Sequence, residues 1–293
     1  MTALPYQGGT SAPIVRPGAL RDLLRRHPTA VVGGFLLVVI IAIAIFAPYL
    51  GTVDPQALSP IRRLRPPNAE NWFGTDSIGR DIYSRVLYGA RISLIVGFSV
   101  AVLSTAIGLV VGLTAGFNRV IDAVVMRIMD GLMAIPPILL AIALMALTRA
   151  SVQNVILAIT IAEVPRVARL VRSLGLSLRE QPFVEAARAA GTPSWRILLR
   201  HILPNTVPPL IVQATYVCAS AIIIEAILSF LGAGTPPTIP SWGNIIAEGR
   251  VLFLVAAYII LIPSIFLSLT VLAVNLLGDG LRDALDPRLA RGL

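Results

Sequence analysis

Residues 181–205 read QPFVEAARAAGTPSWRILLRHILPN, and they lie between long hydrophobic segments. Pro182 suits the first position of a helix, where its missing N–H costs nothing. Glu185 falls near the first turn, where the helix dipole favours an acid. Gly191 is expected to stop this helix, and Thr192 can cap a second one. The stretch therefore predicts two short helices joined by a turn, and the methyl groups on the first would let another protein approach closely.

The order of residues in this stretch resembles the EAA loop of bacterial ABC importer permeases. In that family the loop is a coupling helix that sits in a cleft of the cytoplasmic ATPase. The usual pattern has an aliphatic residue two places before a Leu-Pro pair; this chain has His201 there, which resembles the peptide and nickel branch. Without the resemblance, a basic amphipathic hairpin resting on anionic lipid is also consistent. The resemblance implies ATPase-coupling roles for Glu185, Ala186, Ala187, Arg188, Gly191, Leu203 and Pro204.

The composition predicts an integral membrane protein. The chain has 293 residues, of which 56% are hydrophobic and 13% charged, against about 25% charged in soluble domains. The basic residues are all arginine and fall between apolar runs rather than on one soluble face, so nucleic-acid binding is not indicated. Cys218 is the single cysteine, which excludes a disulfide within the chain, and no Cys/His spacing suggests a metal site.

Hydropathy predicts an all-α protein with six transmembrane helices. The uncharged run after the basic N-terminal tail is too long for a signal-peptide core, although an Ala-x-Ala near Ala42 leaves cleavage as an alternative. Together with the resemblance, the pattern predicts the type I ABC importer permease fold with a cytoplasmic coupling helix. The expected parts are a cytoplasmic tail (1–28), a first membrane helix (29–50), an external loop with a short surface helix (51–90), a core of five helices with the coupling loop at 181–205 (91–278), and a cytoplasmic tail (279–293).

Further stretches in the same order also resemble dipeptide and oligopeptide permeases. They are Phe73 to Asp76 with Gly79-Arg80-Asp81, and the runs LSFLGAG, PSWGNII and LGDGLRDALDPR, so the resemblance covers most of 72–289. Within the first of them, a charged turn in which Arg80 pairs with Asp76 or Asp81 is favoured over direct contact with substrate.

Small residues recur at four-residue spacing in the second predicted span, at Ser104, Gly108, Gly112 and Gly116. This spacing places them on one helix face, where another backbone can approach closely. Packing within this chain's own bundle and packing against a second permease subunit are equally consistent with the pattern. In the third predicted span, residues 131–148, a Pro-Pro pair at 136–137 is expected to kink or break the beginning.

Three charged residues fall within predicted spans. Glu163 and Arg166 lie three residues apart in the fourth, so they can pair on one helix face, and this pairing is favoured over a transport role. Glu225 lies near the outer end of the fifth span, and it is expected to matter for transport if it faces the translocation route. These residues are candidate pathway or structural charges.

The distribution of arginine predicts the orientation. Most of the basic residues fall in the tails and in the loops expected inside, which places both termini and the 181–205 loop in the cytoplasm. The excess of arginine on the predicted cytoplasmic side is moderate, because the first predicted outer loop also contains several arginines.

No motif for nucleotide binding or catalysis is present in the sequence. A G-x-x-x-x-G-K-[ST] loop is absent, so ATP and its magnesium are expected on partner subunits, with no cofactor in this chain and no enzymatic role for it. The resemblance implies a bacterial inner-membrane importer of di- and oligopeptides with a second homologous permease, two ATPase subunits and an external substrate-binding protein. Nickel chelates, glutathione or another solute are alternative cargoes. A proton-coupled secondary carrier is a rival class, but the internal repeats expected of such carriers are not evident.

Overall fold

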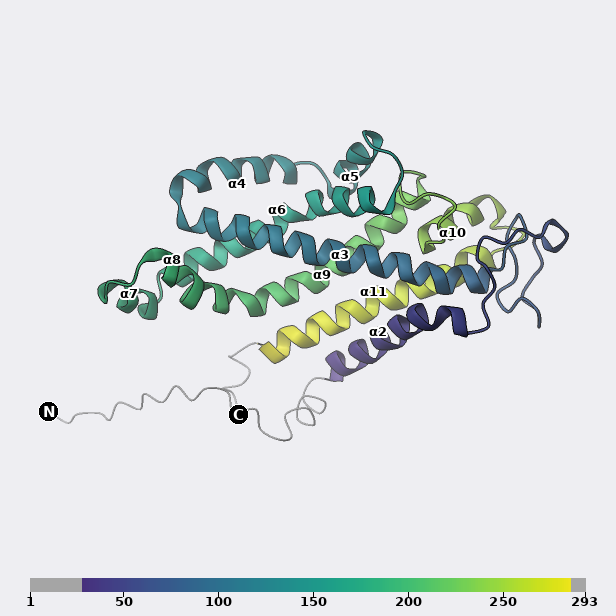
Figure 1. Cartoon of the computed structure of the whole chain (residues 1–293), viewed down its shortest axis with the longest axis horizontal. Helices are drawn as coiled ribbons and strands as arrows, with labels where there is room; N and C mark the ends of the chain where they lie inside the picture. Colours follow the sequence, from purple (N-terminus) through teal and green to yellow (C-terminus); the bar gives the residue numbers. More distant parts are fainter. Residues whose placement is uncertain (1–27, 286–293) are drawn as a thin grey trace.

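The computed structural model describes residues 28–285, which are helical with connecting loops (Figure 1). The predicted tails at 1–28 and 279–293 lie largely outside the described residues. The helices are α2 (Pro28–Phe46), α3 (Ile82–Phe117), α4 (Arg119–Met133), α5 (Pro137–Ala146), α6 (Val152–Arg179), α7 (Pro182–Ala189), α8 (Ser194–Ile197), α9 (Leu203–Phe230), α10 (Trp242–Gly249) and α11 (Tyr258–Leu285).

The six expected spans correspond to three kinds of element. Four runs are long and apolar enough to cross a membrane: α2 with the short turn that follows it, α3, α8 with α9, and α11. The pair α4 and α5 can supply a fifth span, bent by 90° between its two helices. The remaining helix, α6, has 28 residues but carries several charges, and at about 1.5 Å per residue it is long enough to span. The all-α membrane fold is thus confirmed, with an approximate count of spans.

The third span differs from its predicted form. The break predicted at the Pro-Pro pair is present, because the chain bends by 90° between α4 and α5, but the helical segment begins at Arg119 rather than at residue 131. Hydropathy alone misses α4 because it is amphipathic. Its acids pair with arginines of α6: Asp122 accepts a hydrogen bond from Arg172 at 2.7 Å, and Asp130 pairs with Arg169. Both ion pairs join α4 to α6; the Arg169–Asp130 pair is about half exposed and contributes less than the more buried Arg172–Asp122 pair.

The stripe of small residues on α3 packs within this chain's own bundle. A Cβ atom added to Gly108 would come within 2.6 Å of the Val167 side chain, and one added to Gly112 within 2.6 Å of the backbone oxygen of Ala168. Both neighbours belong to α6, so the stripe lets α3 and α6 approach at backbone distance. Of the two interpretations left open by the sequence, the described residues therefore support internal packing.

Replacing Gly112 with valine is expected to destabilise the folded protein, because the neighbouring atom is backbone and cannot rotate away. Overpacking of a tight contact costs about 1–3 kcal/mol or more. The matched control is Gly131→Val on α4, where an added Cβ meets nothing within 4 Å. Size-exclusion chromatography after mild heating in detergent should show loss of the monodisperse peak for Gly112→Val alone. Equal stability of the two variants would contradict the close packing of α3 on α6.

Two features of the segments predicted to be external differ from a simple loop. Residues 82–91 do not form a separate surface helix but are the buried first turns of α3, which Asp81 caps by accepting from the Ser84 N–H at 2.8 Å. Residues 232–248, a Pro/Gly-rich stretch, include the helix α10, which folds back against α3 and α9. The indole of Trp242 is fully buried there and donates to the Val86 carbonyl at 3.1 Å.

Figure 1 shows the arrangement of the two ends of the bundle. The short helices α7 and α8 lie at one end, toward which α2 begins and α11 ends. Helix α10 and the irregular segment between α2 and α3 lie at the opposite end. Helix α3 runs through the middle and contacts α6 and α9, while α11 packs against α2 and α9. The predicted docking loop and the predicted external loop are therefore at opposite ends.

Candidate functional site

The α7–α8 hairpin (residues 181–202) has the turn that its sequence predicts. The N–H of Gly191 donates to the Arg188 carbonyl at 2.9 Å, and the N–H of Thr192 donates to the Ala187 carbonyl at 3.0 Å. This pair of hydrogen bonds is the Schellman motif that ends a helix, in which the residue after the C-cap adopts the left-handed conformation. Gly191 has φ 76°, and glycine adopts this conformation without the steric cost that a side chain incurs. Thr192 is not the cap of α8, which begins at Ser194 after Pro193.

Three aliphatic side chains anchor the hairpin to the bundle. Val184, Ile197 and Ile202 are buried, and they belong to the same core as the spanning helices. Exposed apolar side chains lie on the other side of the hairpin: Trp195 is 59% exposed and Phe183 42% exposed. The hairpin therefore has one face fixed to the bundle and one apolar face that the described residues leave uncovered.

The candidate coupling residues divide between these two faces. Glu185, Ala186 and Arg188 are exposed, whereas Ala187 is half-buried and packs against the core. Ala187 lies partly on the face that α7 turns to the bundle, so its methyl group is less open to a partner than that of Ala186.

The hairpin continues into α9 without an interruption. Residues Leu198–Ile202 form a single π-helical turn between α8 and α9, and Pro204 lies in the first turn of α9 rather than ending a helix. Within this continuous run Pro204 has no N–H to donate, and it lies just after the π-helical turn, the kind of irregularity that is found where the regular hydrogen-bond ladder of a helix is interrupted. The continuous helical run Ser194–Phe230 has 37 residues.

A buried network of charges fixes the opposite end of the bundle. Arg85, 1% exposed, donates to Asp76 at 2.7 Å and to both oxygens of Glu248 at 2.6 and 3.0 Å. Arg80 pairs with Asp76 and also reaches Glu248. The pairing of Arg80 with Asp76 is thus present. The contribution of Glu248 was not predicted, because it lies on α10, far along the sequence.

Comparison with known protein families assigns the chain to one of them. The model of the binding-protein-dependent transport system inner membrane component matches residues 104–291. The chain belongs to this family. A second model, the N-terminal transmembrane domain of oligopeptide transport permease C, matches residues 20–67. The chain is therefore a multi-pass permease of the inner membrane, and its family works with ATPase and substrate-binding components.

Several relatives match over nearly the whole length of the permease. It is 50% identical over 99% of both chains to a probable peptide ABC transporter permease of Sinorhizobium fredii. It is 45% identical to a dipeptide transport system permease of Alkalihalophilus pseudofirmus, covering 91% of this chain and 88% of that one. A glutathione transport system permease of Escherichia coli is 43% identical over 94% of both.

A solved structure matches the fold of the permease. A chain of the MetNI methionine ABC transporter in an inward-facing conformation aligns with a TM-score of 0.59 and 23% identity, covering 69% of this chain and 96% of that one. At this identity the likeness supports the fold alone.

The permease places the three candidate membrane charges in two different settings. Glu163 is fully buried, accepts from the Ser220 hydroxyl at 2.9 Å and pairs with Arg166 at 3.2 Å, so the favoured pairing is present. Glu225 is also fully buried and accepts from Ser229 at 2.9 Å. Glu225 thus lies in the interior of this chain rather than on an open face, near α10.

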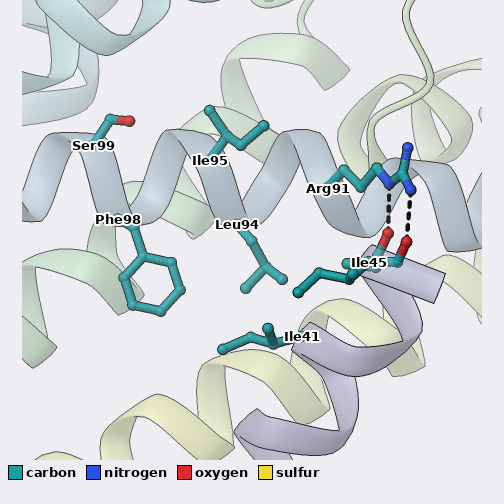
Figure 2. A pocket seen from close by; sticks show the side chains of 8 residues that line it. Ile41, Ile45, Arg91, Leu94, Ile95, Phe98 and Ser99 are labelled. Atoms are coloured by element: carbon teal, nitrogen blue, oxygen red, sulfur yellow. Dashed lines mark hydrogen bonds between the residues drawn. The ribbon is translucent and has the colours of Figure 1, made fainter. Parts of the chain in front are cut away.

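The cavities of the permease differ in polarity. A groove of about 540 Å³ between α2 and α3 is lined mostly by aliphatic and aromatic side chains, with Arg91 at one end bonded to the Ala44 and Ile45 carbonyls (Figure 2). A second cavity, of about 460 Å³, lies between α6, α9 and α11, and its lining includes Gln213, Tyr216 and Arg282. The first suits lipid chains, whereas the second presents hydrogen-bonding groups.

Proposed function

We propose that this permease is one transmembrane subunit of an ATP-driven importer of short peptides. Peptide, dipeptide and glutathione permeases among its relatives support this class of cargo. By this proposal the permease forms half of the translocation pathway and pairs with a second, homologous permease. Two cytoplasmic ATPase subunits and an external binding protein complete the complex. The absence of a phosphate-binding loop in the sequence supports ATP hydrolysis, with its magnesium, on the partners rather than in this chain.

The observation that carries the proposal is the α7–α8 hairpin. Its inner face is fixed by Val184 and Ile197, while Glu185, Ala186 and Arg188 are open to a partner. By this proposal these residues, with Ala187, Gly191, Leu203 and Pro204 supporting their geometry, couple the permease to the ATPase. Movement of the ATPases on binding ATP would displace α8, and the continuous run into α9 would carry the motion to the pathway. A switch of this kind requires contacts that differ between its two states.

Reconstitution tests the proposal directly. The complete complex in proteoliposomes should take up a mixture of di- to penta-alanine only with ATP and the binding protein present. Uptake driven by a proton gradient without ATP would instead favour a secondary carrier. The glutathione relative supports a second cargo, so competition by glutathione should be measured in the same vesicles.

Cysteine labelling checks the proposed orientation, in which both termini and the hairpin are cytoplasmic. A cysteine at exposed Asn68 should react with an impermeant thiol reagent in intact cells, whereas cysteines at Ser194 and Ala284 should react only after lysis. The native Cys218 is buried and should contribute little background. Reaction of the Ser194 position in intact cells would contradict this topology.

A further inference from the structure

Arg166 lies at the centre of α6, a helix long enough to span the membrane, and is 47% exposed on the described chain. It is the fifteenth of the 28 residues of α6, counted from Val152. At about 1.5 Å per residue, it is about 20 Å from either end of the helix. A guanidinium at this depth is costly against lipid, so such residues face protein or a water-filled cavity.

The neighbours of Arg166 define which side of α6 it occupies. On one flank, Glu163 accepts a hydrogen bond from the Ser220 hydroxyl of α9. On the other flank, Arg169 pairs with Asp130 of α4. Arg166 therefore lies on a face of α6 between its contacts with α4 and α9. Ile161 is 43% exposed on the same helix, and the helical period of 100° per residue places it on the opposite side.

Glu163 forms an ion pair with Arg166 and so reduces the electrostatic attraction of the guanidinium for other anions. One of its oxygens accepts from Ser220, while the other, Oε2, is 3.2 Å from the Arg166 guanidinium and receives no hydrogen bond from the described residues. Arg166 has five N–H donors in a planar fork, and Glu163 engages one end of it. Because the side chain is 47% exposed, the remaining donors are available to a partner, and their planar fork suits a planar anion such as a carboxylate.

Polar groups continue from this point toward the end of the bundle where the hairpin lies. Ser220, Tyr216 and Gln213 are spaced by four and three residues, so they share one face of α9. Tyr216 and Gln213 line the cavity of about 460 Å³, together with Leu170 of α6, which follows Arg166 by one turn. The aliphatic groove between α2 and α3 has no such series (Figure 2).

We infer that Arg166 lines the translocation pathway and receives the C-terminal carboxylate of the peptide in transit. This inference rests on the proposed function, because it assigns the cargo group that meets one residue of the pathway. A peptide that enters a membrane pathway must keep its carboxylate paired. Because Glu163 partly neutralises Arg166, the guanidinium binds the peptide carboxylate weakly enough to release it. Transport along a pathway requires such reversible binding.

The test compares Arg166→Gln with wild type in the complete reconstituted complex. Uptake of di- to penta-alanine should fall by about tenfold or more, because losing a charged hydrogen-bonded pair commonly costs at least a power of ten in binding. Assembly and ATP hydrolysis stimulated by the binding protein should persist. The uptake ratio of free-acid to C-terminally amidated peptides should also fall relative to wild type, a comparison that cancels the preference of the binding protein. Arg166→Lys should recover part of the uptake, and the matched control Arg169→Gln should retain it.

A second measurement does not depend on transport. In a Cys218→Ser background, a cysteine at Arg166 should react with a water-soluble methanethiosulfonate reagent, and one at Ile161, on the opposite side of α6, should not. Unchanged uptake in Arg166→Gln, or an unreactive cysteine at this position, would overturn the inference. Loss of pairing with the second permease in Arg166→Gln would also overturn it and make the residue a subunit contact. Absence of uptake by the wild-type complex would instead overturn the proposed function, and the inference with it.

Discussion

Replacing Gly191 with valine is expected to abolish binding of the ATPases while the membrane bundle still folds. Gly191 has φ 76°, where a side chain costs about 1–2 kcal/mol even before branching at Cβ adds to it. An added Cβ meets no atom within 4 Å, so the strain can be relieved only by changing the turn. That change would reorient α7 against α8 and separate the exposed residues from the geometry proposed for docking. Pull-down of the ATPases and stimulated ATP hydrolysis are the measurements.

The permease offers a matched control for this substitution. Gly232 ends α9 with the same pair of hydrogen bonds, from Gly232 to Ser229 and from Ala233 to Leu228, and it has φ 81° with no atom near its Cβ position. Valine at Gly232 introduces similar strain at the opposite end of α9. It should leave ATPase binding intact. Loss of binding in both variants would indicate general misfolding rather than a docking defect.

Substitutions on α7 separate its open face from its packed face. Ala186→Arg adds bulk to an exposed position and should block docking without changing the stability of the bundle. Ala187→Arg should damage both, because Ala187 packs against the core. Glu185→Ala should be mild, since an exposed charge pair contributes only about 0–1 kcal/mol. Full ATPase binding and stimulated turnover in both Gly191→Val and Ala186→Arg would exclude this hairpin as the coupling element.

The sequence is informative where one local rule determines the structure. A bilayer requires long apolar helices, so hydropathy located α2, α3, α9 and α11. A glycine after a helical pattern predicted the turn at Gly191, because few other residues adopt its φ. These features depend on neighbours in the chain, and they are confirmed although several boundaries moved.

Features that depend on contacts between distant segments were not accessible in the same way. Helix α10 has eight residues between Pro/Gly-rich and irregular segments, and contacts with distant segments, including the burial of Trp242 against α3, stabilise it. Whether Ala187 is open or packed depends on how the hairpin meets the bundle. Arg85 and Glu248 are 163 residues apart, and nothing in either local sequence indicates that they meet.

Replacing Arg85 with methionine is expected to have the largest effect on stability at the end of the bundle where α10 lies. The change removes bonds to Asp76 and Glu248 and leaves Arg80 as the remaining cation of this network among the described residues. Breaking a buried ion pair by removing one partner costs about 3–5 kcal/mol, because a buried charge is left uncompensated. For a protein of this size, such a loss lowers the unfolding temperature on the order of 10 °C. Thermal unfolding of the purified permease in detergent measures it.

Burial of the ion pairs is the reason for this large effect, so an exposed ion pair serves as the control. Arg62 pairs with Glu70 at 3.9 Å, and both side chains are more than half exposed. Arg62→Met should therefore change the unfolding temperature little, because water screens an exposed pair. Adding Asp76→Asn to Arg85→Met should recover part of the loss, since it removes a carboxylate that would otherwise remain buried beside too little positive charge. If Arg85→Met unfolds at the wild-type temperature, the network does not hold α10 against the start of α3, and the packing of Trp242 must hold it instead.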